Sequence, residues 1–315
     1  MLRANHAVRL GLRAASRNPE LAFGKALIDQ VGNFLSLLPL ALGALLVATV
    51  LRGGPLRAAL AGLRALLAVR WPVAGAMLAA LAAGFAASMF FWAGAVPLLA
   101  ADAELNRRPP PGNFAVLLSR GAARTTVAGA LGWGASLTFT FSCYAVLLLA
   151  AFAAFFRPSA GAFAGAAFAG AAILIGSVLL DALARLTVVR AAAFGDSGTA
   201  AFAKAASFLG ARLGACATVT VAFIFLELIV AAVAGMLVGL LPVAFSPPEA
   251  LMALAPRAAV ALATGAVLAW LEVGRMGALA ALVADAEGLI EPQAPPEPPP
   301  VAELVVEALP ADDVI

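Results

Sequence analysis

The sequence predicts an all-α, polytopic integral membrane protein with about six transmembrane helices. Hydrophobic residues make up 63% of the 315-residue chain and charged residues only 12%, whereas a soluble domain carries roughly a quarter charged residues. Several apolar stretches are longer than the roughly 20 residues that a helix needs to cross the bilayer core. We expect these spans and interleaved amphipathic helices to form one transmembrane domain over residues 1–288.

Helix-breaking segments separate the apolar stretches. Arg52, Gly53, Gly54 and Pro55 end the first stretch, the run Pro109–Pro111 follows the second, and Pro247 and Pro248 follow the fifth. The predicted spans are residues 31–51, 71–100, 127–156, 162–186, 214–241 and 258–282.

Amphipathic segments lead into several of these spans. In residues 4–17, arginines recur every fourth position beside an apolar stripe, which is typical of a helix lying on a membrane surface. Residues 56–67, 114–124 and 202–213 have a similar pattern. We expect the following basic side chains to lie at the lipid headgroups: Arg9, Arg13, Arg17, Arg57, Arg64, Arg120, Arg124, Lys204 and Arg212.

The last segment, residues 289–315, contains PQAPPEPPP followed by acidic residues among apolar ones. This composition cannot bury a core, so the sequence predicts a disordered tail. The tail is either a solvated extension or a short motif that docks onto a partner.

The distribution of basic residues favours cytoplasmic N- and C-termini, because Lys and Arg are enriched in cytoplasmic loops. Arg52, Arg57, Arg64 and Arg70 oppose this orientation, since they would lie in the first outer loop. Only Lys25 and Lys204 are lysines among 20 basic residues, and this bias toward Arg is typical of GC-rich coding sequences. We therefore expect the inner membrane of a bacterium.

Glu227 is the clearest candidate for a functional intramembrane residue. It lies near the centre of the fifth span, where a charge costs about 3 kcal/mol on insertion scales. No basic residue is near it in sequence, so we expect its partners to be hydroxyls of the third span, Thr138, Ser142 and Tyr144. The carboxyl group would be a proton or cation site, or a protonated acid that joins two helices.

Two other intramembrane carboxylates have basic neighbours on their own helices. Glu272 precedes Arg275 by three residues, and Asp181 precedes Arg185 by four. Both spacings place the two side chains on one helix face, so local ion pairs are expected.

The chain does not carry the residues of a recognisable catalyst. Its one histidine, His6, lies in the N-terminal amphipathic segment, so the Gly195–Gly198 string GDSG has no base for a serine nucleophile and is interpreted as a turn. HExxH, Walker and dinucleotide-binding motifs are absent from the sequence. We expect neither enzymatic activity, a metal site nor a cofactor, and the small net charge of +3 argues against nucleic acid as a partner.

The two halves of the chain have a similar order of spans and breaks. Gly54 would correspond to Gly198 and Pro111 to Pro248, which would make the halves an inverted repeat of three spans each. Abundant Ala, Gly and Leu also produce such matches by chance, so the repeat stays one of two interpretations.

The layout of six spans, together with the run RLTVVRAAAFGDSGTAAFAKAASFLGARLG after the fourth, resembles the loose bacterial group related to the membrane domain attached to glycerophosphodiester phosphodiesterases. The resemblance covers roughly residues 9–285 and implies a helical membrane domain without the phosphodiesterase itself.

Two functional hypotheses follow. The first is a non-catalytic membrane-embedded component or scaffold that binds lipids or other membrane-protein subunits through its basic surface helices, small-residue faces and tail. The second is a small secondary permease that uses the carboxylate of Glu227.

Overall fold

The structure is a computed structural model that describes residues 2–51, 55–105, 114–156, 159–244 and 254–290. Over residues 38–51 and 55–70 it describes the backbone alone. These parts of the chain form helices and no strand, which confirms the all-α prediction. The predicted tail lies outside the described residues, apart from its first two positions.

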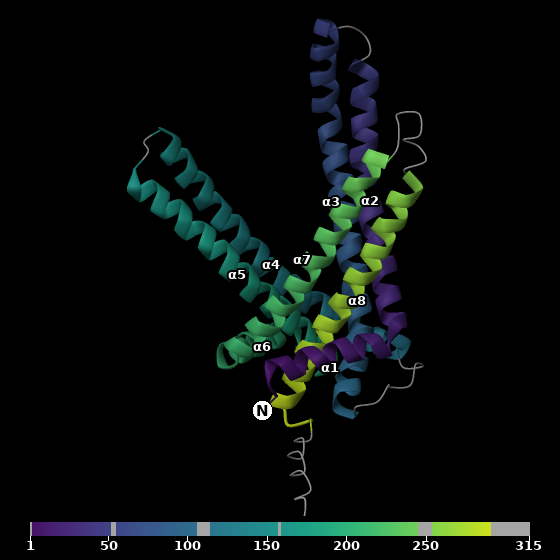
Figure 1. Ribbon diagram of the computed structural model, residues 1–315, viewed down its shortest axis with the longest axis vertical. Coiled ribbons are helices and arrows are strands. Elements are labelled where there is room, and N and C mark those ends of the chain that lie inside the picture. The colour runs from purple at the N-terminus through teal and green to yellow at the C-terminus, as the bar shows by residue number, and fades with distance from the viewer. Residues whose placement is uncertain (1, 52–54, 106–113, 157–158, 245–253, 291–315) are drawn as a thin grey trace, which may run out of the picture.

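The described residues form eight helices (Figure 1). In chain order they are α1 (Ala4–Arg17), α2 (Pro19–Leu51), α3 (Pro55–Leu105), α4 (Phe114–Phe156), α5 (Ala160–Ala193), α6 (Gly198–Ala211), α7 (Leu213–Ala244) and α8 (Leu254–Ala286).

Five of these helices contain segments long and apolar enough to cross a membrane, as judged over the described residues. The segments are Trp71–Glu104, Phe114–Ala153, Phe163–Ala193, Leu213–Leu240 and Ala255–Ala286, and they overlap the last five predicted spans. The chain is therefore an integral membrane protein. The first predicted span, residues 31–51, lies within α2, and most of its side chains are outside the described part, so the count of six stays a prediction.

Two of the expected surface helices are not separate elements. Residues 56–67 are the beginning of α3, which continues through Pro72 and Pro97 for 51 residues. At 1.5 Å per residue this helix is roughly 75 Å long, well beyond the thickness of a bilayer core. Residues 114–124 likewise form the first turns of α4. No turn sequence separates either segment from the span that follows.

In contrast, α1 and α6 are separate helices of 14 residues. The helix α1 ends at Arg17, and Asn18 after it has non-helical backbone angles. Pro19 begins α2, a position at which proline is favoured because its fixed φ suits the first turn of a helix. Before α6, Gly195 has a φ of 74°, a value that glycine adopts without strain. The GDSG string is thus a turn that leads into α6, as the sequence predicted.

The long helices pair into three hairpins, α2–α3, α4–α5 and α7–α8, which meet at one end. Toward the other end, α4–α5 diverges from the other two (Figure 1). Each hairpin has an amphipathic segment at its beginning: α1 before α2, the first turns of α4 itself, and α6 before α7. All three hairpins begin and end at the shared end, so they run in the same direction within the bundle (Figure 1). This grouping differs from the inverted repeat of two halves; Gly54, Pro111 and Pro248, which defined that repeat, lie outside the described residues.

The first and third hairpins also share sequence. Residues 101–104 and 284–287 both read Ala-Asp-Ala-Glu, at the ends of α3 and α8. Asp102 accepts a hydrogen bond from Arg17 at the end of α1 (3.4 Å), and Asp285 accepts one from Arg212 at the end of α6 (2.6 Å). Each short helix is thus tied to the second long helix of its own hairpin.

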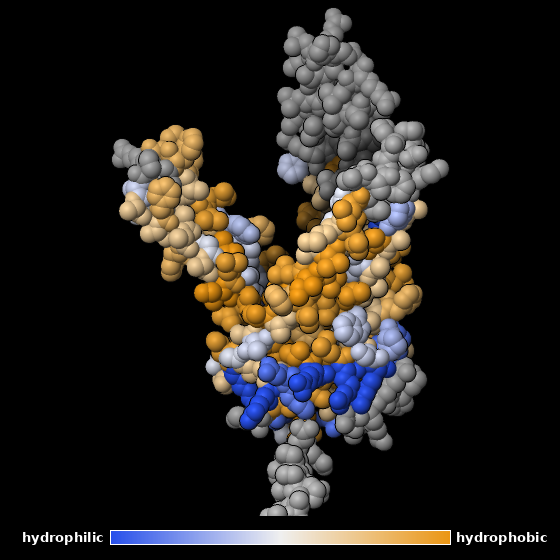
Figure 2. Space-filling view, viewed as in Figure 1, coloured by the Kyte–Doolittle hydropathy of each residue, from blue (hydrophilic) through white to orange (hydrophobic). Residues whose placement is uncertain are grey.

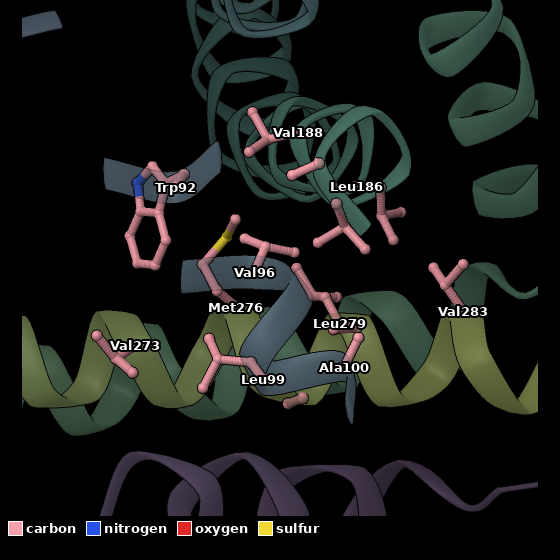
Figure 3. Packing of buried hydrophobic residues seen from close by; sticks show 14 of the residues in the cluster. Trp92, Val96, Leu99, Ala100, Leu186, Val188, Val273, Met276, Leu279 and Val283 are labelled. Atoms are coloured by element: carbon pink, nitrogen blue, oxygen red, sulfur yellow. The ribbon is translucent and has the colours of Figure 1, made fainter. Parts of the chain in front are cut away.

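The apolar core lies at the shared end. It is formed mainly by the C-terminal halves of α3, α5 and α8, over residues 89–103, 182–192 and 269–284. Figure 3 shows Val96 and Leu99 of α3 and Leu186 of α5 packed around Met276 and Leu279 of α8. Most side chains beyond this core are exposed and apolar, as lipid-facing residues are.

The helix α1 crosses α8 at this end. Its inner face, Ala7, Gly11, Ala14 and Ala15, is buried, and a Cβ atom at Gly11 would lie 2.1 Å from the carbonyl oxygen of Gly274. Only a glycine allows this close approach. The helix is therefore packed onto the bundle, with Arg9 and Arg13 on its exposed face. Figure 2 shows that face as a polar band below an apolar surface.

Candidate functional site

Seven charged side chains from four helices form a continuous series of ion pairs. They are Lys25 and Asp29 of α2, Asp181 and Arg185 of α5, Glu227 of α7, and Glu272 and Arg275 of α8. On α2, α5 and α8 the two charged residues are three or four positions apart, which places them on one face of the helix. That face points toward the other hairpins.

Lys25 begins the series. Its Nζ donates to both carboxylate oxygens of Asp29, at 2.5 and 2.7 Å, and lies 2.7 Å from Oε2 of Glu272. The other oxygen of Glu272 accepts a hydrogen bond from Nη1 of Arg185 at 3.1 Å. Arg185 also donates from Nε to Asp181, at 3.1 and 3.0 Å. Glu272 therefore joins α2 to α5.

Arg275 completes the series. Its Nη1 donates to Oδ2 of Asp181 at 2.7 Å, and its Nη2 donates to Oε1 of Glu227. The Arg275 side chain is only 3% exposed. A guanidinium group can bind two carboxylates at once because its donors are fixed in a planar fork. Arg275 thereby links α8 to both α5 and α7.

The seven groups form an unbranched row in which the charges alternate: Asp29, Lys25, Glu272, Arg185, Asp181, Arg275, Glu227. We call this row the charge chain. The four carboxylates outnumber the three basic groups by one. The two terminal carboxylates have one cationic neighbour each, and their side chains are the most exposed of the seven, 36% for Asp29 and 28% for Glu227.

The sequence predicted Glu227 as a site residue, but the structure gives it a different partner. Arg275, 48 residues away, binds the carboxylate. Thr138 and Ser142 donate instead to carbonyl oxygens of their own helix, those of Gly134 and Thr138, at 2.8 Å each. Tyr144 is 49% exposed. The four residues do not come together, because the α4–α5 hairpin diverges from α7 (Figure 1).

The local ion pair expected between Glu272 and Arg275 is wrong. Glu272 binds Lys25 and Arg185, and Arg275 binds Asp181 and Glu227. The pair of Asp181 and Arg185 is confirmed, at 3.0 Å. Lys25 and Asp29 were missed, although their spacing of four residues at the edge of the first predicted span was a signal for a helical ion pair.

Two cavities border the charge chain. One of about 200 Å³ contains Arg185 and Glu272 in its wall, together with Trp92 and Trp133. The cations Lys25 and Arg185 lie 5.7 Å from the ring centres of Trp92 and Trp133, respectively, an arrangement that stabilises a partly desolvated cation.

The second cavity, of about 310 Å³, lies between α2, α3 and α8. Asp29, Gln30 and Asn33 line it, and Phe85 borders both cavities. One end of the charge chain therefore opens into a cavity with further polar side chains.

The basic residues predicted at the lipid headgroups fall into two groups. Arg9, Arg13 and Arg120 are exposed. The others whose side chains are described contact the protein: Arg17 binds Asp102, Arg212 binds Asp285, Lys204 binds Asp196 at 2.5 Å, and Arg124 lies beside Gly195. The side chains of Arg57 and Arg64 lie outside the described part.

In the described part of the chain, no three His, Cys, Asp or Glu side chains come together as metal ligands would. Comparison of the chain with protein-family models, with curated proteins and with solved structures gives no match. The chemistry of the charge chain is therefore argued from its own residues.

The order of charges predicts different effects for two substitutions that remove the same charge. Glu227→Gln removes a terminal carboxylate and leaves three acids facing three bases, whereas Glu272→Gln deprives both Lys25 and Arg185 of a partner. Breaking a buried ion pair costs about 3–5 kcal/mol, so we expect Glu272→Gln to lower the melting temperature in detergent clearly more than Glu227→Gln. Equal decreases in the melting temperatures of the two variants would show that the position of a carboxylate within the charge chain does not matter.

Proposed function

We propose that the protein is a non-catalytic membrane-embedded component that binds lipids, with acyl chains along its diverging hairpins and anionic headgroups on its basic band. The α4–α5 hairpin carries this proposal. Over residues 133–153 of α4 no described side chain is buried, and over 160–181 of α5 Ala169 alone is buried among those described. The hairpin thus projects from the bundle with apolar surface around it.

The exposed side chains of this hairpin are large and apolar on several sides. They include Phe141, Leu148 and Phe152 of α4 and Phe163, Phe168 and Leu174 of α5. The opening between the hairpin and α7 is visible in Figure 2, and Phe225, Leu228 and Met236 of α7 are exposed as well. Hydrocarbon chains are the occupant that such surfaces accept in a bilayer.

The polar band supplies the second half of the proposed binding surface. Arg9 and Arg13 lie one helical turn apart on the outer face of α1, and neither forms an ion pair within the described residues. Guanidinium groups bind phosphate oxygens well, and each basic residue near an anionic membrane surface contributes about 1 kcal/mol.

The proposal also concerns the membrane in which the protein lies and its orientation there. The polar band would face the cytoplasm of a bacterium from its inner membrane, with both termini on that side. A relationship to the membrane domains attached to glycerophosphodiester phosphodiesterases is part of the same proposal. Its support is the run over residues 185–214, which forms the end of α5, the turn and α6.

Native mass spectrometry in mild detergent tests lipid binding. We expect wild-type protein to retain anionic phospholipid in preference to zwitterionic phospholipid. The double variant Arg9→Gln/Arg13→Gln should lose most of this preference, because it removes two headgroup ligands. Arg9→Lys/Arg13→Lys keeps both charges and is the matched control. An unchanged preference for anionic phospholipid in Arg9→Gln/Arg13→Gln would contradict the proposal, as would tight retention of another protein in place of lipid.

A small permease is the second candidate, and the charge chain favours it. Intramembrane ionisable residues often mark ion or proton pathways, and here they border two cavities. A permease that uses Glu227 should drive proton or cation flux in proteoliposomes, and Glu227→Gln should abolish that flux without changing the melting temperature greatly. Equal flux in wild-type protein and Glu227→Gln rules this candidate out, and so does wild-type flux that is no greater than that of empty liposomes.

A further inference from the structure

We propose that the cavity between α2, α3 and α8 binds a monovalent metal cation, held by Asp29 with help from the side-chain amides of Gln30 and Asn33. The binding site is the cavity of about 310 Å³ that these three residues line. The proposal concerns binding at equilibrium, so it does not depend on transport.

The balance of charge is the first argument. Within the charge chain, three basic groups face four carboxylates, and each interior member has two neighbours of opposite charge. The terminal members share their single neighbour with another carboxylate. An uncompensated charge in a low-dielectric environment is unfavourable, so one added positive charge at an end would complete the alternation.

The surroundings distinguish the two ends. Glu227 is 28% exposed, next to exposed apolar residues of α7, and it lines neither cavity. Asp29 lines the larger cavity, one turn before Asn33 on the same helix. Gln30 and Asn33 line the same cavity, with Gly32 and Gly84 in its wall where α2 faces α3. Oxygen donors are available at the Asp29 end.

The donor set fits a hard cation, because carboxylate and amide oxygens are the ligands that hard cations prefer. Calcium sites usually contain several carboxylates, whereas this cavity has one, and the ammonium group of Lys25 is 2.5 Å from it. The positive charge of this ammonium group disfavours a cation that carries a second unit of charge. The volume leaves room for an ion and several waters, each of which occupies about 30 Å³ in the liquid.

Asn33 allows a test that leaves the charge chain intact. Its side chain is exposed and forms no hydrogen bond within the described residues, so Asn33→Ala should fold normally. Gln30 is a less suitable choice, because its amide packs against Gly265, where a Cβ would lie 2.0 Å from Nε2.

The experiment measures the melting temperature of the purified full chain as NaCl replaces N-methyl-D-glucamine chloride at constant ionic strength. We expect a saturable rise with Na⁺. We expect Asn33→Ala to raise the half-saturating Na⁺ concentration by about tenfold, which corresponds to about 1.4 kcal/mol of binding free energy. We expect Asp29→Asn to remove the rise. In Glu227→Gln three acids face three bases, so we expect a saturable rise with a higher half-saturating Na⁺ concentration than in wild-type protein.

Three results would overturn the proposal. Equal melting temperatures in Na⁺ and N-methyl-D-glucamine would show that no metal cation binds. An unchanged half-saturating concentration in Asn33→Ala would place the ion elsewhere. Saturation by Ca²⁺ at far lower concentration than by Na⁺ would assign the site to a divalent ion.

Discussion

Arg275 is the residue on which the arrangement of the bundle depends most. Its side chain is 3% exposed, and its two terminal nitrogens bind Asp181 of α5 and Glu227 of α7. A guanidinium group inside an apolar bundle is strongly unfavourable unless its donors are paired. The carboxylates of α5 and α7 must therefore lie close to Arg275 of α8. In the same way, Lys25 of α2 must lie close to Glu272 of α8.

This constraint explains why the hairpins meet at one end. In a bilayer, apolar side chains gain little by leaving lipid for a helix interface, so packing and polar contacts decide which helices associate. The charge chain joins α2, α5, α7 and α8, and small residues such as Gly11 and Gly274 allow α1 to approach α8 closely. Farther along the hairpins such contacts are rare, and lipid can cover the apolar surface at no cost.

The hydropathy pattern and the helix-breaking segments predicted the fold class. They also placed the last five spans close to their observed positions, because the bilayer thickness sets the minimum length of a span. Surface helices were predicted less well. Residues 56–67 had the expected stripe, yet no break separates them from the span that begins at Trp71, so both belong to α3. The partner of Glu227 could not be predicted. Pairing between Arg275 and Glu227 depends on how α7 and α8 pack, and single-sequence spacing identifies only neighbours on one helix.

The most direct test of this account is a measurement of the surroundings of Arg275 in a lipid bilayer. Solid-state NMR on protein with ¹⁵N-labelled arginine and ¹³C-carboxyl-labelled glutamate and aspartate reports dipolar contacts between guanidinium and carboxylate groups, and the signals lost in Arg275→Lys belong to Arg275. We predict that one glutamate and one aspartate contact are lost, and that Glu227→Gln removes the glutamate contact alone. Loss of no carboxylate contact in Arg275→Lys would contradict the account.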